Sequence, residues 1–253
     1  MQVHQILSAL TIRLSIALFF NLFWHFPMQA QQPPIRSLGE LINQQDPGWP
    51  LVSTWIREAT NRVQVLLRTP ARADSALVAA QVTTRSPLGA IVYETGGILV
   101  DGGWLRILGS GSPGLNRTLM SWNQGKIRGL LLVADDVLGG FYALNGGAFG
   151  QESIGKVFYF APESLHWQPL NKTYSEFLIF SFSGDLKNFY HGLRWKGWEQ
   201  EIGLLTGNQG LACYPFLFTT EGKNAAKNKR TAVPIAELWS FGQDMQRQLD
   251  GQK

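Results

Sequence analysis

The sequence predicts an α+β fold, an antiparallel sheet of mixed strand length at roughly residues 90–170 with helices before and after it. Pairs of glycines, Gly96-Gly97 and Gly102-Gly103, separate short apolar runs. They are typical of hairpins, because glycine adopts positive φ at little cost. No helical pattern of 10–15 residues separates most of the apolar runs, which disfavours a parallel doubly wound sheet. Helix caps and helical apolar spacing are found on both sides of this region instead.

The elements follow in order along the chain. Before the sheet, we expect helices over residues 37–43, from residue 46 to 61 and over 69–80, and a strand over 63–67. The sheet is expected to contain residues 90–94, 98–101, 104–108, 130–134, 140–144 and 156–161. After the sheet, Thr173 and Glu176 form a capping box, and helical spacing continues over 186–193, 198–205 and 235–249.

The first 30 residues have the organisation of a secretory signal. Arg13 precedes a mostly apolar run at residues 14–26, and a small residue, Ala30, ends the segment. The run is too short to span a bilayer. We therefore expect a signal peptide over residues 1–30 and export to the periplasm or the medium. Two alternatives stay open: an uncleaved anchor, and a cytoplasmic protein that starts at Met28.

The mature chain is expected to have a polar lead at residues 31–36 and a single α+β domain at 37–253. The full sequence has 45% hydrophobic and 16% charged residues, which excludes a disordered protein. The single cysteine, Cys213, excludes an intrachain disulfide framework and a cysteine-based zinc site, and reads as a small buried hydrophobe.

The net charge of +4 is too small to indicate a nucleic-acid partner. The densest basic stretch, residues 223–230, lacks interleaved aromatic residues and is expected to be a solvated loop. We predict no cofactor and no metal.

Residues 109–114 (GSGSPG) match the dinucleotide-binding pattern GxGxxG literally, with Asp135 at about the position of a ribose-binding acid. Such a site requires a helix that starts within the glycine turn. Pro113 and the polar residues after it interrupt that start, so we expect a glycine-rich surface loop that binds no dinucleotide.

Six residues are candidates for binding. Asp101, Asp135 and Asp136 adjoin glycine pairs and are expected in turns, with calcium binding or acid chemistry as alternatives. Adjacent carboxylates in a strand point to opposite faces, so Asp135 and Asp136 form no dyad while the strand continues. Arg85 lies in a hydroxyl-rich loop, where it either ties a helix to the sheet or holds an anion.

The two remaining candidates are tryptophans. Trp122 and Trp195 are flanked by glycine and polar residues, so they are candidate exposed anchors of an interface, with burial in the core as the alternative. No catalytic residue is assigned, because no GxSxG, HExxH or P-loop pattern is present.

A series of motifs resembles the bacterial domain-of-unknown-function family number 2625, from about Ser37 to the C-terminus. It includes QVTTRSPLGAIVYETGGILVDGGWLRILGSGS, LLVADDVLGGFYALNGG and SGDLKNFYHGLRWKGWEQE. That family has no established catalytic residues, so the resemblance assigns none. Residues 130–178 also resemble the SUKH superfamily, which includes immunity proteins that bind and neutralise bacterial toxins.

Two classes of function follow. One is a non-catalytic, immunity-like module that binds a protein partner such as a toxin. The other is a small hydrolase or transferase that uses Arg85 with Asp101, Asp135 or Asp136. The first predicts that these four residues are scattered, and the second that they converge in a cleft.

Overall fold

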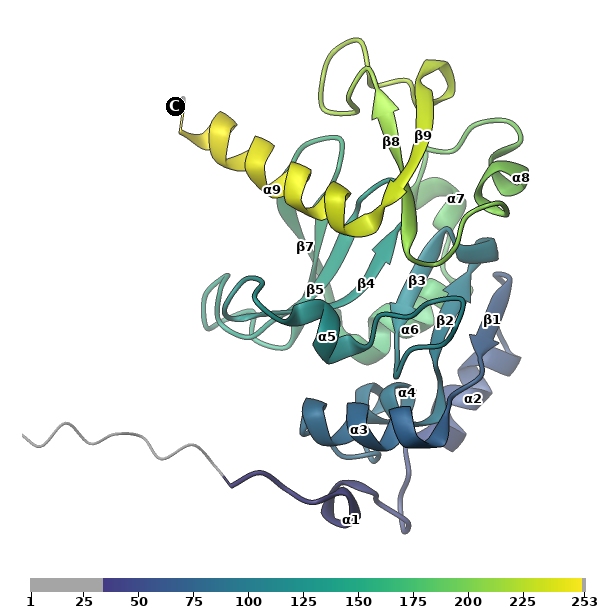
Figure 1. The fold of residues 1–253 in the computed structure, drawn as a ribbon, viewed down its shortest axis with the longest axis vertical. Coiled ribbons are helices and arrows are strands. Elements are labelled where there is room, and N and C mark those ends of the chain that lie inside the picture. Colours follow the sequence, from purple (N-terminus) through teal and green to yellow (C-terminus); the bar gives the residue numbers. More distant parts are fainter. Residues whose placement is uncertain (1–33, 252–253) are drawn as a thin grey trace, which may run out of the picture. The chain divides into compact units, whose positions relative to one another are not determined.

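The structure, a computed structural model, describes residues 34–251. The predicted signal peptide, residues 1–30, lies outside the described residues. Figure 1 shows a twisted central sheet with helices on both of its faces and a separate two-stranded hairpin near the C-terminal helix. The architecture is α+β, with an antiparallel sheet and flanking N-terminal and C-terminal helices, which confirms the predicted fold class.

The main sheet has seven strands: β1 (Val63–Leu66), β2 (Gly97–Val100), β3 (Leu105–Leu108), β4 (Leu130–Asp136), β5 (Phe141–Asn145), β6 (Lys156–Ala161) and β7 (His166–Thr173). The hairpin consists of β8 (Gln209–Tyr214) and β9 (Lys229–Pro234). The α-helices are α1 (Leu38–Leu41), α2 (Trp49–Arg57), α3 (Pro70–Ala80), α4 (Pro87–Glu94), α5 (Leu119–Asn123), α6 (Tyr174–Ser183), α7 (Leu186–Phe189), α8 (Trp198–Ile202) and α9 (Ile235–Asp250). Two short 3₁₀ turns are η1 (Asp101–Gly103) and η2 (Ala225–Lys227).

The main sheet is a pure meander, because the strands lie side by side in chain order and every neighbouring pair is antiparallel. Gly102 and Gly103 join β2 to β3 with positive φ, as the glycine pattern predicts. The sheet begins one strand earlier than expected, because β1 pairs with β2 at the edge.

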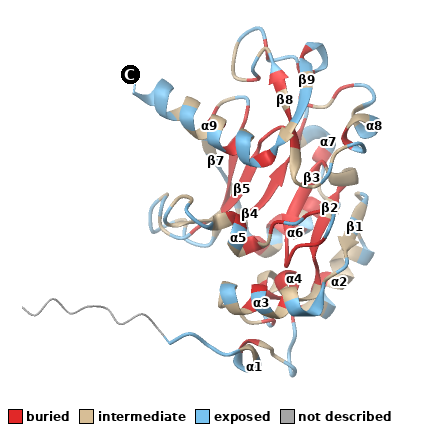
Figure 2. Cartoon of the chain, viewed as in Figure 1, coloured by how far each residue is buried: buried red, intermediate tan, exposed pale blue. Residues whose placement is uncertain are grey.

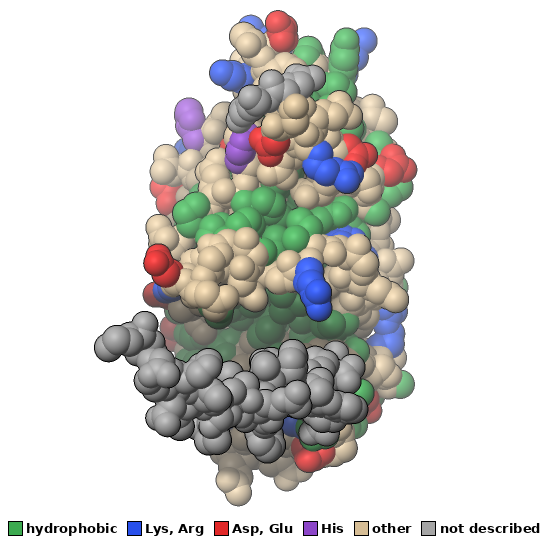
Figure 3. Space-filling view, turned by 90° about the vertical axis from the view of Figure 1, so that its left-hand side faces the viewer, with side chains coloured by type: hydrophobic (Ala, Val, Ile, Leu, Met, Phe, Trp, Pro, Cys, Tyr) green, Lys and Arg blue, Asp and Glu red, His purple; other side chains and the backbone are tan. Residues whose placement is uncertain are grey.

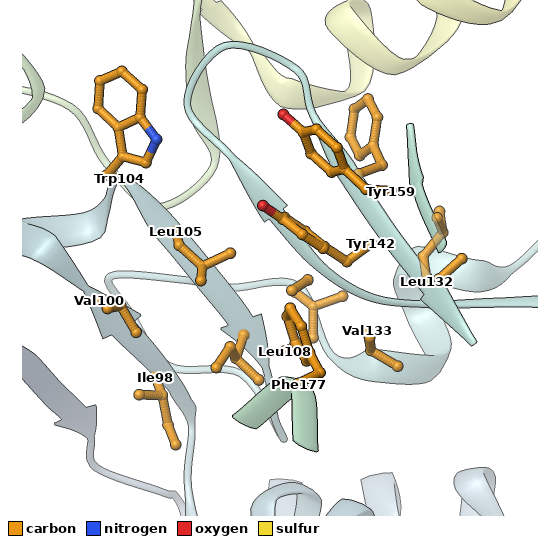
Figure 4. Packing of buried hydrophobic residues seen from close by; sticks show 14 of the residues in the cluster. Ile98, Val100, Trp104, Leu105, Leu108, Leu132, Val133, Tyr142, Tyr159 and Phe177 are labelled. Atoms are coloured by element: carbon orange, nitrogen blue, oxygen red, sulfur yellow. The ribbon is translucent and has the colours of Figure 1, made fainter. Parts of the chain in front are cut away.

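The central strands β2 to β6 are mostly buried on both faces, whereas the edge strands β1 and β7 are partly exposed (Figure 2). Tyr142 and its cross-strand partner Tyr159 point to the α6 face, where Phe177 of α6 lies 5.0 Å from Tyr142 between ring centroids (Figure 4). The next pair, Phe141 and Phe160, points to the opposite face, which we call the α9 face. There α9 packs on the sheet, and the Trp239 ring meets Phe141 edge-on at 4.9 Å.

Residues 90–94 form no strand, and this prediction was wrong. They are the end of α4, which starts at Pro87 after an N-cap at Ser86, whose hydroxyl accepts the Gly89 N–H. A serine cap followed by proline at the first helical position is a strong helix start. The apolar run favoured a strand because residues 89–92 of α4 are consecutively buried and none of its residues is fully exposed, so the helix has no polar stripe.

The C-terminal third contains more than helices, which also corrects the prediction. Strands β8 and β9 pair over their full length, and the basic stretch at 223–230 includes the turn η2 and the start of β9. The Leu211 N–H donates to the Val137 carbonyl at 2.7 Å and joins the hairpin to the turn after β4. The hairpin therefore extends the core instead of standing apart from it.

Several predicted helices are present with the expected caps. Helix α3 starts at Pro70 after Thr69, and the Thr173–Glu176 capping box opens α6. Helix α2 starts at Trp49, later than the expected Asp46-Pro47, with Pro50 in its first turn. No helix within residues 34–251 is long and apolar enough to cross a membrane.

Candidate functional site

The four polar candidates from the sequence do not come together in one cleft. Arg85 lies on the surface, where its Nε contacts Asp46 at 3.0 Å and both side chains are about two-thirds exposed or more. Asp101 lies in η1 between β2 and β3. Asp135 and Asp136 end β4 and point to opposite faces of the sheet. Each of the four therefore has its own surroundings and its own partners.

Asp135 is completely buried on the α9 face between two arginines. Its Oδ1 accepts from Arg106 of β3 at 2.6 Å, and Arg117 from the loop after β3 donates to its other oxygen. Arg106 also donates to the carbonyl of Gln209, the first residue of β8, and Arg117 also donates to the carbonyl of Gly207, which precedes β8. This ion cluster is a structural junction between the sheet and the C-terminal hairpin, and not the turn that the sequence predicts for Asp135.

Asp136 is buried on the α6 face and organises the β4–β5 turn. Its Oδ1 accepts the N–H groups of Leu138 and Gly140, both at 2.9 Å, and its Oδ2 accepts the Tyr159 hydroxyl at 2.9 Å. Burial raises the pKa of this carboxyl to about 6, and these hydrogen bonds only partly oppose the shift. Asp136 therefore has the turn role that the sequence predicts, but inside the core.

Asp101 pairs with Arg194, whose Nη2 lies 2.7 Å from the Asp101 Oδ2. The Arg194 guanidinium also lies over the Trp198 ring at 4.4 Å and close to Trp104 at 4.9 Å. This half-buried group holds the segment after α7 against the β2–β3 turn. A stacked, paired arginine is a packing element here.

Trp122 and Trp195 are buried, so the possibility that they are exposed anchors is excluded. Trp122 stacks near Phe141 and lies under the Arg117 guanidinium, 4.5 Å from its centre. Trp195 packs on Trp104 and is covered by Arg230 at 4.0 Å. Glycine and polar neighbours in the sequence do not reveal that Arg117 covers Trp122, or that Arg230 from the distant strand β9 covers Trp195.

The GSGSPG segment contains no helix start. Helix α5 begins at Leu119 after the N-cap Thr118, beyond the glycine turn. Ser110 and Ser112 are buried, which corrects the expectation of a surface loop, while Pro113 and Gly114 are exposed. Within residues 34–251 no group of three or more His, Cys, Asp or Glu side chains is placed to hold a metal ion.

The best-formed concave site is an apolar pocket of about 240 Å³ between α9, the β8–β9 hairpin and the turn after β6. Its wall is almost entirely hydrophobic, and we call it the apolar pocket. It is lined by Leu138, Gly139, Phe160, Pro162, Leu165, Leu211, Ala212, Cys213, Phe216, Leu217, Phe218, Val233, Glu237, Leu238, Phe241 and Gly242.

Aromatic side chains from the hairpin tip form the outer wall of the apolar pocket. Phe216 stacks on Phe218 at 5.4 Å and contacts Phe241 of α9 at 4.8 Å. Phe216 is 38% exposed, so this wall faces solvent. Gly242 of α9 lies close to Phe160 on the opposite wall of the pocket. A Cβ at this position would come within 3.0 Å of the Phe160 ring. Phe216 and Phe218 of the hairpin tip thus form an aromatic rim around the opening of the apolar pocket, whose floor is hydrophobic.

The side chains that line the apolar pocket favour ligand binding over catalysis. Burial raises the pKa of the Cys213 thiol to about 11, which leaves it protonated at neutral pH and a poor nucleophile. Glu237 is the one charged residue among the described residues that line the pocket. An apolar pocket with few polar groups is the usual form of a binding site.

A second cleft, about 660 Å³ in volume, lies between α3 and α5 and is more open. Alanines and short polar side chains line it, and the Arg72 guanidinium there donates to the Asn116 carbonyl at 2.8 Å. It offers no comparable cluster of large apolar side chains, so the apolar pocket is the stronger candidate.

Sequence reasoning missed the apolar pocket because it missed the hairpin. The alternation of β9 is weak, and the apolar run after Cys213 has no helical or strand period. The turn at Leu138 and Gly139, the hairpin tip and α9 converge only through long-range packing. One signal was available: Leu238 and Phe241 fall on a single stripe of the predicted last helix.

Comparison with known proteins places the chain in a family. The profile described as "Protein of unknown function DUF2625" matches residues 38–238. The uncharacterized protein YbfG of Escherichia coli (strain K12) is 41% identical over 214 residues, which cover 83% of this chain and 97% of that protein. An uncharacterized protein of Haemophilus influenzae is 44% identical over 190 residues, which cover 72% of this chain and 83% of that protein. The chain therefore belongs to the DUF2625 family, as its sequence motifs predict.

Proposed function

We propose that this chain is an exported, non-catalytic protein-binding module, and that its binding surface is the apolar pocket. The observation that carries the proposal is the pocket itself, an open apolar cavity beneath a partly exposed aromatic rim. Burial of two apolar side chains from a partner would contribute about 3–6 kcal/mol. That is sufficient for a specific contact when the surrounding surface adds complementarity.

The wider surface supports the same proposal. Figure 3 shows hydrophobic side chains gathered in a band across the face toward which the C-terminal end of α9 points. Contiguous exposed apolar surface commonly marks a site of protein contact.

The alternative, an enzyme that uses Arg85 with Asp101, Asp135 or Asp136, lacks a geometric basis. Arg85 is paired on the surface, Asp101 is paired to Arg194, and Asp135 is enclosed by Arg106 and Arg117. Asp136 lies on the other face of the sheet. An acid–base mechanism needs these groups within reach of one substrate.

A photo-crosslinking residue in place of Phe216 tests the proposal in the native host. We expect a discrete crosslinked product that is lost when Phe241→Asp is added, because a buried charge closes the apolar pocket to apolar side chains. The matched control places the same crosslinker at Leu204, which is exposed and lies outside the pocket. Equal products from both positions, or a Phe216 product that Phe241→Asp leaves unchanged, would contradict the proposal.

An immunity-like role is the finer form of this proposal, and it rests on the resemblance of residues 130–178 to the SUKH superfamily. It requires that the partner crosslinked at Phe216 be a toxin, and that co-expression of this chain restore growth of cells producing that toxin. A partner without toxicity would rule out immunity but would leave the binding module intact.

A further inference from the structure

We propose that the loop between β8 and β9 docks on the surface of an anionic lipid bilayer. Residues 215–228 form this loop, and it contains most of the densest basic stretch of the sequence. We call four side chains of the loop and its strand ends, Tyr214, Lys223, Lys227 and Lys229, the lysine patch. None of them lines the apolar pocket, so the inference is independent of the proposed protein-binding function.

The lysine patch has a surplus of positive charge. Its three lysines are exposed, and none of them forms an ion pair within residues 34–251. Glu221 is the one acidic residue between positions 214 and 230. The neighbouring arginine, Arg230, is already paired with Glu201 at 3.0 Å. The fold therefore leaves this charge uncompensated, and a negatively charged partner would compensate it.

Tyr214 adds an exposed aromatic ring to the lysine patch. Its side chain is 67% exposed and lies directly across the hairpin from Lys229. The ring also meets Phe216 edge-on, with 6.1 Å between the ring centroids. Tyrosine is enriched where proteins meet the interface of a bilayer, because its ring is apolar and its hydroxyl stays hydrated. Apolar contact and electrostatic attraction together hold proteins on anionic membranes.

Hydrogen bonds inside the loop hold the lysine patch in place. The Asn228 amide donates to the Gly222 carbonyl at 2.8 Å, and the Arg230 Nη1 donates to the carbonyls of Ala225 and Asn228 at 2.7 and 2.9 Å. Ala225 is fully buried, whereas the lysines on both sides of it are exposed. The loop backbone is thus ordered before binding, which lowers the entropic cost of contact.

The position of the loop and its residue types favour a bilayer over other anionic partners. In Figure 1 the loop is at the upper end of the β8–β9 hairpin, away from the main sheet, where a flat surface reaches it first. The unpaired cations are all lysines, which act as point charges and suit a diffuse negative surface. Specific carboxylate and phosphate sites in proteins and nucleic acids are more often contacted by arginine forks.

Flotation of the protein purified from its native host tests the proposal. One set of vesicles contains phosphatidylcholine with phosphatidylglycerol, and the other contains phosphatidylcholine alone. We expect binding to the anionic vesicles at low salt, at least about tenfold weaker binding to the neutral ones, and a decrease as salt screens the charges.

The triple variant Lys223→Gln, Lys227→Gln, Lys229→Gln should weaken binding to the anionic vesicles at least about tenfold, because each lysine near such a surface contributes about fivefold. The matched control is Arg57→Gln, Arg128→Gln, Lys187→Gln. It removes the same charge from exposed positions outside the hairpin that form no ion pair among the described residues. We expect the control to bind within about twofold of the wild type.

A fluorescent label shows which part of the chain meets the lipid. In a Cys213→Ala background, which removes the single cysteine of the chain, the environment-sensitive fluorophore NBD is attached at Tyr214→Cys. Its emission should shift to the blue on the anionic vesicles. The same label at Leu67→Cys, which is exposed and lies outside the hairpin, should not shift.

Three results would overturn the proposal. The first is absent or equal binding to the two kinds of vesicle, and the second is equal loss of binding in the triple variant and its matched control. The third is binding to polyglutamate or to a single-stranded oligonucleotide at least as strong as binding to anionic vesicles of equal charge, which would identify an acidic protein or a nucleic acid as the partner. None of these results affects crosslinking at the apolar pocket, so the two proposals fail separately.

Discussion

At the scale of single residues, neighbouring carboxylates with similar sequence surroundings have different physical roles. Asp135 compensates two buried arginines, whereas Asp136 accepts hydrogen bonds from a turn and a tyrosine and has no ion pair. The sequence alone predicts that adjacent side chains in a strand point to opposite faces of the sheet. It does not predict the partners of Asp135, because they come from other segments. Whether a carboxylate is buried and paired therefore depends on tertiary contacts and not on its neighbours in the sequence.

The variant Asp135→Asn should destabilise the protein by about 3–5 kcal/mol, because it leaves Arg106 and Arg117 buried without their anion. Urea unfolding followed by circular dichroism measures the change. The control is Arg85→Ala, which removes an exposed pair and should cost less than about 1 kcal/mol. Similar losses in the two variants would show that the ion cluster contributes no more than a surface pair.

Asp136 should make stability fall as the pH rises from about 4 to about 6. Its pKa is about 6 in the folded protein and near 3.8 when exposed, so in this range the folded state binds more protons than the unfolded state. The shift corresponds to about 3 kcal/mol of stability, fully present below the unfolded pKa and lost above the folded pKa.

The isosteric variant Asp136→Asn should remove this contribution and be at least as stable as the wild type at pH 7, because its amide can serve the same turn without a buried charge. The difference in unfolding free energy between the two proteins, measured from pH 4 to 7, isolates the contribution of Asp136. A constant difference across that range would show that Asp136 does not titrate there.

At the scale of elements, the amphipathic helices and the strands of the meander were predictable, whereas helix α4 and the β8–β9 hairpin were not. The Thr173–Glu176 capping box locates α6, and the proline at the first position of α3, Pro70, locates α3, because both signals are local. Helix α4 reads as a strand, since its buried residues 89–92 are consecutive and the helix has no polar stripe. The β8–β9 hairpin was missed for a related reason. The contacts that hold it against the main sheet are long-range: the hydrogen bond from the Leu211 N–H to the Val137 carbonyl, and the one from Arg117 to the Gly207 carbonyl. The apolar pocket lies partly on this missed hairpin and partly on β6 and α9, which were predicted.

Ser86→Ala should destabilise the protein by about 1 kcal/mol, because the α4 N-cap loses the acceptor for the Gly89 N–H. Ser86→Asp should restore most of the loss, because aspartate is also a good cap. Chemical denaturation of the three proteins makes the comparison. Gly89→Ala should cost more than either, since its Cβ would lie 2.0 Å from the Thr83 carbonyl oxygen. Equal stability of Ser86→Ala and the wild type would mean that packing alone fixes the start of α4.

At the scale of the whole molecule, the folded unit and the exported chain are expected to coincide. Among the described residues the core extends from Leu41 to Trp239, and the family profile matches residues 38–238. If residues 1–30 are a signal peptide, the protein isolated from its native host should have the intact mass of residues 31–253 and occur outside the cytoplasm. Replacement of apolar residues in the 14–26 run by charged ones should block export and leave a protein of full-length mass in the cytoplasm. As a control, Ala substitutions at Gln31 and Gln32, after Ala30, should leave export unchanged. A cytoplasmic protein with the mass of a chain starting at Met1 or Met28 would refute export, and the binding surface would then have to serve a partner inside the cell.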